Sequence, residues 1–236
     1  MFKDKGGRRW RLAASRRSWG LIAAAGIVTG GTPAAIPLHA SPRADPFDTI
    51  FTIAGEPAAL HYRAEFGGAG PSHVVEVWRD RDRRLKRVTD TAVETYAAHK
   101  PGGANFNMLV VDHRKRIVTE IGRDSLYRLG NFTDWFDLAH GLRHPKGAYR
   151  LAAATAPAAS PKPVDRCEWY NLVENARATR VCWSVHDRLP LLILASNSSL
   201  LWRVTALDRT PFAKDIFRIP DKGYVRINAN RDAERD

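Results

Sequence analysis

Leu60-His61-Tyr62-Arg63-Ala64-Glu65-Phe66 is the stretch that first indicates the fold class. Its apolar side chains alternate with His61, Arg63 and Glu65, and a period of two is typical of a strand with one buried face. Comparable segments follow, most of them joined by short polar turns. We expect further strands at 73–78, 84–89, 93–98, 106–111, 117–121, 167–173, 179–185, 191–195, 201–207 and 216–219. Short turns favour antiparallel pairing, because a parallel crossover needs about a dozen residues or more.

One helix is expected in the middle of the chain. The spacing i, i+3, i+4, i+7, which forms one apolar helix face, is found at Trp135, Leu138, Ala139 and Leu142. Thr133 is a suitable N-cap, and Pro145 and Gly147 are expected to end the helix. The Ala/Pro-rich residues 152–163 are expected to form a surface loop within one domain rather than a linker between two.

Residues 1–40 have the order of an export signal: a basic start, an uncharged apolar centre and the small-residue ending Leu38-His39-Ala40. Cleavage is favoured over a retained anchor, because glycines and prolines interrupt the apolar centre. Arg16-Arg17 resembles a twin-arginine signal in part, so the twin-arginine and general secretion routes both stay open. We therefore expect a periplasmic domain over residues 41–236, with a flexible tail from about residue 230.

Much of the positive charge lies in this predicted signal. The whole chain holds 37 basic and 25 acidic residues, a net charge of +12. Residues 1–40 contain seven of the basic residues and one acidic residue, which leaves 30 and 24, or +6, for residues 41–236. A domain this mildly basic lacks the charge of a typical nucleic-acid-binding protein. A nucleic-acid partner is therefore not expected.

Cys167 and Cys182 are the two cysteines of the sequence. An even number of cysteines in an exported protein favours a disulfide. If Glu174-Asn175 is the tip of a hairpin, the cysteines lie directly opposite each other, within the distance that a disulfide bridges. A catalytic thiol and a metal-binding pair are the alternatives, and no CxxC spacing supports either.

Two parts of the chain resemble a known family. A strand ending in Val77-Trp78 is followed by the basic stretch 79–87 and by the strand end Leu109-Val110-Val111-Asp112. Later, Leu201-Trp202-Arg203-Val204-Thr205 precedes Phe217-Arg218-Ile219-Pro220 and Gly223-Tyr224. These segments are similar to the periplasmic outer-membrane lipoprotein carriers, the LolA-like family.

The LolA-like resemblance covers roughly residues 57–228. Arg81, Leu85 and Lys86 stand at positions similar to an Arg-Pro-x-x-aromatic-Arg stretch of that family, and Asp82 replaces its proline. The resemblance implies an α+β, β-rich fold: a curved antiparallel sheet, an unclosed half-barrel, with helices covering its concave apolar face. The family usually begins with an amphipathic helix, whereas residues 45–55 are short and weakly patterned, so the lid or the ligand could differ.

The same resemblance directs attention to an apolar cavity between sheet and helix. Candidate ligand-binding residues are Trp78, Leu109, Val111, Trp135, Phe136, Leu138 and Trp202. For each of them, an ordinary packed core is the alternative. Candidates for docking a lipid headgroup or an acidic partner are Arg81, Arg84 and Lys86, since arginine offers bidentate contacts to phosphate. A solvated hairpin tip is the alternative for this basic stretch.

Residues for catalysis or cofactor binding form no recognisable pattern. His140 and His144 have a spacing that places both on one helix face, but no third metal ligand accompanies them. His113 is expected to lie in a solvated turn. No G-x-S-x-G elbow, phosphate loop or dinucleotide fingerprint is present in the sequence. We therefore predict that the chain is not an enzyme and takes no cofactor or metal.

Three functions follow as hypotheses. The leading one is a periplasmic carrier that sequesters acyl chains of lipids or lipoproteins in an apolar cavity, with transient contact to a membrane surface. Each buried CH₂ group would contribute about 0.8 kcal/mol. The alternative is an envelope stress-sensing or scaffold module that binds a protein partner through the same half-barrel. A third hypothesis, a secreted hydrolase, would need clustered polar residues in a cleft.

Overall fold

The computed structural model describes residues 47–68, 70–81, 83–99, 105–123, 125–126 and 135–230. All of these fall within the unit Pro42–Asp236. The predicted export signal, the N-cap Thr133 and the end of the predicted tail lie outside the described residues, as does Asp82.

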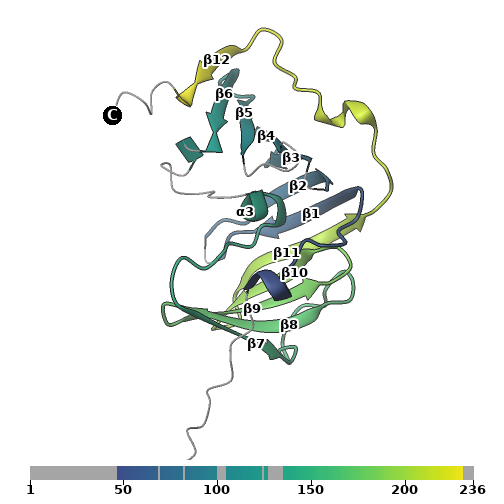
Figure 1. Ribbon diagram of the computed structural model, residues 1–236, viewed down its shortest axis with the longest axis vertical. Helices are drawn as coiled ribbons and strands as arrows, with labels where there is room; N and C mark the ends of the chain where they lie inside the picture. Colours follow the sequence, from purple (N-terminus) through teal and green to yellow (C-terminus); the bar gives the residue numbers. More distant parts are fainter. Residues whose placement is uncertain are drawn as a thin grey trace, which may run out of the picture. The chain divides into compact units, whose positions relative to one another are not determined.

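One sheet contains the twelve strands of the described chain (Figure 1). In chain order they are β1 (Leu60–Phe66), β2 (His73–Asp80), β3 (Arg84–Thr89), β4 (Val93–His99), β5 (Phe106–Asp112), β6 (Ile117–Gly122), β7 (Tyr149–Ala154), β8 (Glu168–Glu174), β9 (Arg177–Ser184), β10 (Leu189–Ala195), β11 (Leu200–Asp208) and β12 (Val225–Asn228). The spatial order is β12-β6-β5-β4-β3-β2-β1-β11-β10-β9-β8-β7. The sheet is curved and does not close, because β12 and β7 remain at opposite edges.

Antiparallel pairing holds throughout this sheet except at one edge, where β12 runs parallel to β6. The predicted β-rich fold with an open, curved, mostly antiparallel sheet is therefore confirmed. Three local predictions were wrong. Residues 214–217 form a 3₁₀ helix, η1 (Lys214–Phe217), instead of starting a strand at 216. Ala152–Ala154 belong to β7 rather than to a loop, and β12 was not predicted.

The helices of the described chain are short. They are α1 (Phe47–Ile50) and α3 (Trp135–His140). The predicted helix was expected to continue to Pro145, but it ends at His140 because Gly141 adopts a left-handed conformation, with φ 68°. A residue in this conformation is a common helix terminator. Helices that cover the whole concave face remain a prediction, since α1 and α3 contain four and six residues.

The sheet has two faces that differ in what they contact. Leu85, Ala97, Met108 and Ile121 are directly paired across β3, β4, β5 and β6, and they pack in one buried cluster with Leu138 of α3. We call this side the helix face. Because successive side chains of a strand point to opposite faces, the residues between these positions lie on the other side, which we call the outer face.

Candidate functional site

The strand register brings predicted site residues together on the outer face. Trp78, Lys86, Tyr96 and Leu109 are directly paired, one on each of β2, β3, β4 and β5. Residues paired in this way share a face and their side chains are neighbours. His61 of β1 extends the row, because its ring stacks on Trp78 with the ring centres 4.6 Å apart. The result is a mixed aromatic, aliphatic and basic row across five strands.

The apolar candidates therefore do not line one cavity. Trp78, Leu109 and Val111 belong to the outer face, where Val111 is fully buried in a small cluster with Tyr96 and Val118. The other candidates, Trp135, Phe136, Leu138 and Trp202, contact the helix face. The sequence did not predict the sheet face on which each candidate lies, because a shift of one residue in strand register moves every side chain to the opposite face.

The helix-face candidates are packed closely. Trp135 stacks on His99 at 5.0 Å between ring centres and contacts the edge of Phe106. Leu138 is 1% exposed. Trp202 donates a hydrogen bond from Nε1 to the carbonyl oxygen of Pro190 at 2.8 Å. These contacts are those of a protein core, and a ligand role for these residues stays a prediction.

A pocket of about 140 Å³ lies at the outer-face row. Its lining includes Arg84, Tyr96, Asn107, Leu109, Phe217 and Ile219. The last two residues come from the segment 209–224, which connects β11 to β12 and contains η1; we call this segment the strap. In Figure 1 the strap runs along one side of the sheet from β11 to β12. The pocket is thus bounded by the sheet on one side and the strap on the other.

Of the predicted docking cations, Arg84 lines this pocket and Lys86 lies in the adjoining row, and both already have intramolecular contacts. Arg84 donates to Asp80 from Nη2 at 2.8 Å, and its guanidinium lies 4.4 Å from the ring centre of Phe217. Lys86 Nζ lies 3.5 Å from a carboxylate oxygen of Glu94 and 5.4 Å from the ring centre of Trp78. Cation–ring contacts of this kind are attractive. The basic stretch is therefore more than a solvated hairpin tip.

Arg81, the third docking candidate, is separate from the pocket contacts. It is exposed in the turn between β2 and β3, with φ 46°. The neighbouring Asp80 is buried, which by itself raises its pKa, but hydrogen bonds from Arg84 and Arg83 outweigh burial and lower the pKa below its usual value. Asp80 therefore remains a carboxylate that holds the base of this turn.

A polar network fixes the end of the strap. Tyr224 shares a hydrogen bond with Nδ1 of His113 at 2.9 Å, and Arg116 lies over the Tyr224 ring at 5.3 Å. Glu94 accepts a hydrogen bond from Tyr96 and lies 3.5 Å from Nε2 of His113. Burial, followed by the Glu94 hydrogen bond, raises the pKa of Tyr96. His113 is thus a contact residue of the strap, and its side chain is 28% exposed, so the turn residue that we expected to be solvated is only partly so.

A second polar cluster is buried near α3, and sequence reasoning missed it. Arg79, which is 0% exposed, donates to the carbonyl oxygen of Asp187 at 2.6 Å and lies 3.4 Å from Glu56. His140 Nε2 lies 3.5 Å from the same Glu56 oxygen. Burial, followed by the charge of Arg79, lowers the pKa of His140 to about 4, so this histidine is neutral at pH 7. Arg79 continues the alternation of the buried Val75 and Val77, and this signal could have placed it inside.

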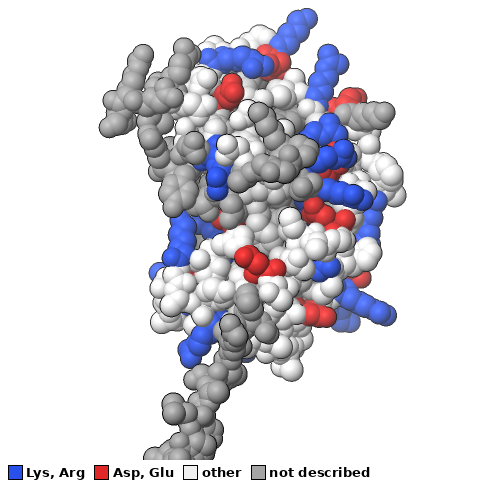
Figure 2. Space-filling model, viewed as in Figure 1, with Lys and Arg blue, Asp and Glu red and all other residues white. Residues whose placement is uncertain are grey.

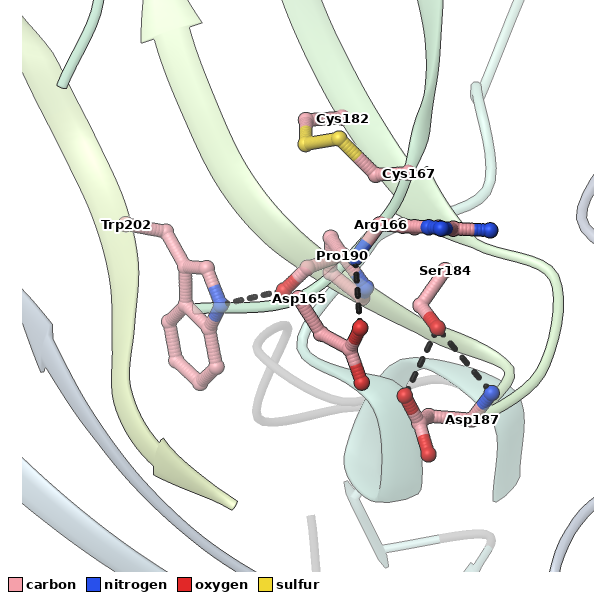
Figure 3. Close-up of a disulfide and its surroundings, with 8 residues drawn as sticks. All are labelled: Asp165, Arg166, Cys167, Cys182, Ser184, Asp187, Pro190 and Trp202. Carbon is pink, nitrogen blue, oxygen red and sulfur yellow. Dashed lines mark hydrogen bonds between the residues drawn. A yellow bond between two sulfur atoms is a disulfide. The ribbon is translucent and has the colours of Figure 1, made fainter. Parts of the chain in front are cut away.

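The disulfide between Cys167 and Cys182 is confirmed, with Cα atoms 5.3 Å apart (Figure 3). Its register differs from the prediction. The hairpin turn is Asn175-Ala176, so Cys182 is paired with Trp169, and Cys167 lies two residues earlier, just before β8. The bridge is therefore diagonal to the strands rather than between directly opposite residues.

Next to the disulfide, carboxylates hold Arg209, the first residue of the strap. Arg209 donates to both carboxylate oxygens of the buried Asp187, at 2.7 and 2.9 Å, and to Asp165 at 2.5 Å. Ser184 donates to the same Asp187 carboxylate at 2.7 Å (Figure 3). Burial raises the pKa of Asp187, but the hydrogen bonds from Arg209 and Ser184 outweigh burial, so the net pKa lies below its usual value.

Ser184, His186 and Asp187 lie close together, but their contacts differ from those of a catalytic triad. The Ser184 hydroxyl donates to Asp187, while His186 Nδ1 contacts the other carboxylate oxygen at 3.2 Å. In a triad, the serine hydroxyl must donate to the histidine, which acts as the base. This arrangement caps a turn and has no activated nucleophile.

Within the described ranges, no group of three or more His, Cys, Asp or Glu residues is arranged to hold a metal ion. His144 lies beyond α3 and contacts Asp137 at 3.2 Å and Asp48 at 2.9 Å. Among the helices that the structure describes, none has the length and apolar composition needed to cross a bilayer. In the view of Figure 2, basic and acidic side chains are interspersed rather than forming one basic face.

Comparisons with known proteins give matches among solved structures alone. No protein-family model and no curated protein matches the sequence. Solved structures that the chain resembles include MucB, with 15% sequence identity, a TM-score of 0.37, and coverage of 75% of this chain and 63% of that one. PNGF-II in the C2 space group gives 8% identity and a TM-score of 0.37 over 72% of this chain and 30% of that one. The chain thus spans less than two thirds of the length of either protein.

Proposed function

We propose that this chain is an exported, non-enzymatic binding protein that docks a protein partner on its outer face. The observation that carries the proposal is the pocket at the outer-face row, in which Leu109 and Tyr96 meet Arg84 beside the strap. Apolar contact area next to a cation suits a partner segment with an apolar anchor and an acidic group, because aromatic and arginine side chains often dominate such interfaces.

The size of the pocket favours a protein partner over a lipid. Sites for drug-sized ligands typically have volumes of about 300 to 1,000 Å³. The outer-face pocket, at about 140 Å³, is below that range. It has room for an apolar side chain or two, but not for a full acyl chain. This comparison supports the interaction-module hypothesis at this site.

A periplasmic location is part of the proposal. The predicted signal in residues 1–40 and the disulfide between Cys167 and Cys182 support it, because disulfides persist mainly in oxidising compartments. The absence of catalysis is likewise a proposal, supported by the contacts of Ser184 with Asp187 in place of a histidine.

Partner capture from envelope extracts tests the docking proposal. We would compare the intact chain with Arg84→Glu and Leu109→Asp, which alter the charge and the apolar lining of the pocket. Arg150→Glu is the matched control, since Arg150 is an exposed arginine on the edge strand β7. We expect a specific partner to be retained by the control and lost by both pocket variants. A partner retained equally by all four proteins would contradict docking at the outer face.

An acyl-chain carrier remains the second candidate, because the helix face is broad and apolar. Leu85, Ala97, Phe106 and Met108 form a continuous buried cluster beneath Leu138 of α3. An acyl chain would have to replace α3 there, with each buried CH₂ group contributing about 0.8 kcal/mol. Mass spectrometry of protein purified by gentle extraction should then detect bound lipid. Lipid-free protein that also fails to take up lipid from vesicles would rule out this candidate.

A further inference from the structure

We propose that the outer-face site is a peptide groove and that the strap is its internal ligand. The inference rests on the proposed function and deepens it by naming the partner class. The partner is an extended peptide with an aromatic residue followed two positions later by a branched aliphatic residue, and it binds by replacing the middle of the strap.

The strap itself contains an aromatic residue followed two positions later by a branched aliphatic residue. Phe217 lies under the guanidinium of Arg84, at 4.4 Å from the ring centre, and Ile219 packs on the cluster of Tyr96 and Val111. Arg218, between them, has extended backbone angles, φ −73° and ψ 127°. In extended chain, residues two apart point to the same side. Phe217 and Ile219 therefore both point toward the sheet.

Side chains, rather than backbone pairing, hold the middle of the strap. The backbone-to-backbone hydrogen bonds that residues 213–224 form with other described residues are local, as in Arg218 N–H to Asp215 O and Tyr224 N–H to Asp221 O. Near the end of the strap, Gly223 O also accepts from the Arg116 side chain at 3.4 Å. Pairing of this segment with the sheet backbone begins at Val225, whose N–H donates to Arg116 O at 2.9 Å. A segment held in this way can leave the groove without breaking the ladder of the sheet.

The fit between the strap and the groove is incomplete. Phe217 and Ile219 are half-buried, and the pocket of about 140 Å³ remains between them and Leu109. Protein interiors are normally packed with few voids of this size. A partner peptide with a larger side chain at either position would fill the space that the strap leaves empty.

Both ends of the strap are fixed by polar contacts. Arg209 is held by Asp187 and Asp165, and Tyr224 is held by His113. Between these ends, Asp221 forms an ion pair with Arg226 close to Tyr224, whereas Phe217 and Ile219 lie on the sheet through side-chain contacts. The part of the strap around Phe217 and Ile219 can therefore be displaced while its ends stay in place. The geometry suits reversible exchange with a partner peptide.

A synthetic peptide with the sequence of residues 214–224, labelled with fluorescein, tests the proposal by fluorescence anisotropy. The full chain is compared with the double variant Phe217→Ser/Ile219→Ser, in which the strap lacks the two apolar side chains that occupy the groove. We expect the double variant to bind the peptide at least tenfold more tightly than the intact chain. A peptide with the same two serines should not bind. Val185→Ser, which removes an exposed aliphatic side chain elsewhere, is the control and should behave as the intact chain.

The outcomes separate this inference from the proposed function. Binding by the double variant that is lost on adding Leu109→Asp supports both. Equal binding to the intact chain and the double variant overturns the strap as internal ligand, while docking at the groove survives. No binding by a double variant whose circular dichroism is native overturns the peptide class. If that variant instead binds phosphatidylglycerol vesicles, a membrane surface is the ligand, and the peptide proposal is likewise overturned.

Discussion

Replacing Arg79 with methionine should destabilise the protein strongly, because the buried cluster of Arg79, Glu56 and His140 depends on this one cation. Methionine keeps much of the side-chain volume but removes the charge and the donors. The carbonyl oxygens of Asp187 and Arg188 then lose hydrogen bonds of 2.6 and 3.3 Å. Glu56, whose side chain is only 8% exposed, loses the cation 3.4 Å away.

Breaking one partner of a buried ion pair typically costs about 3 to 5 kcal/mol, because an uncompensated charge stays behind. We expect the free energy of unfolding of Arg79→Met to fall by about this amount. Adding Glu56→Gln removes the uncompensated charge. The double variant should therefore recover part of the loss, with a coupling energy of roughly 1 to 3 kcal/mol. The pKa of His140 should rise above about 4, because the nearby positive charge that helps to lower it is gone.

Urea unfolding followed by tryptophan fluorescence measures the two free energies, and NMR titration of the histidine resonances measures the pKa. Arg150→Met is the matched control: Arg150 is exposed, and its loss should change stability by less than about 0.5 kcal/mol. Strictly additive effects of the two cluster substitutions would refute the reasoning. So would an Arg79→Met variant that is as stable as the control.

Three further predictions concern stability. Replacing Cys167 and Cys182 together by alanine should lower the free energy of unfolding by about 3 kcal/mol, the loop-closure value for a separation of 15 residues, and urea unfolding of the oxidised and reduced protein should show the same difference. Gly141→Ala should lower the free energy of unfolding by about 1 to 2 kcal/mol, because φ of Gly141 is 68° and an added Cβ would lie 3.2 Å from Trp202. Gly147→Ala is the control and should leave stability unchanged, so equal melting temperatures of the two variants would contradict this prediction. Stability should fall as pH drops from 6.5 toward about 4, where the unfolded chain binds a proton that folded His140 does not, and His140→Phe should flatten this part of the profile.

Strand β1 was predictable because its side chains alternate in polarity, and the observed bounds of both β1 and β3 equal the predicted ones. β7 was missed because three of its six residues are alanines, which are depleted in strands and give no alternation. Residues 217–219 do alternate, but their period of two comes from docking Phe217 and Ile219 on a sheet face, not from strand pairing. The same local pattern thus has two structural causes.

The candidate site was predicted only in part. Residue chemistry indicated Arg84, Lys86, Trp78 and Leu109, and the structure places them around one outer-face row. Sequence could not separate this group from Trp135, because the face of each residue is set by long-range register. The contribution of the strap was likewise hidden, since more than one hundred residues separate Tyr224 from its contact His113.

Arg209 connects the disulfide to the groove, because it is the first residue of the strap and is bound by a carboxylate close to Cys167. Asp165, which holds Arg209, lies two residues before Cys167, so the cystine limits where this carboxylate can be. A reduced chain lacks that restraint at the root of the strap. We therefore expect thiol reductants to change the rate at which the strap exchanges with a peptide in the groove, even though no cysteine lines the pocket. The redox state of the disulfide would then control peptide binding.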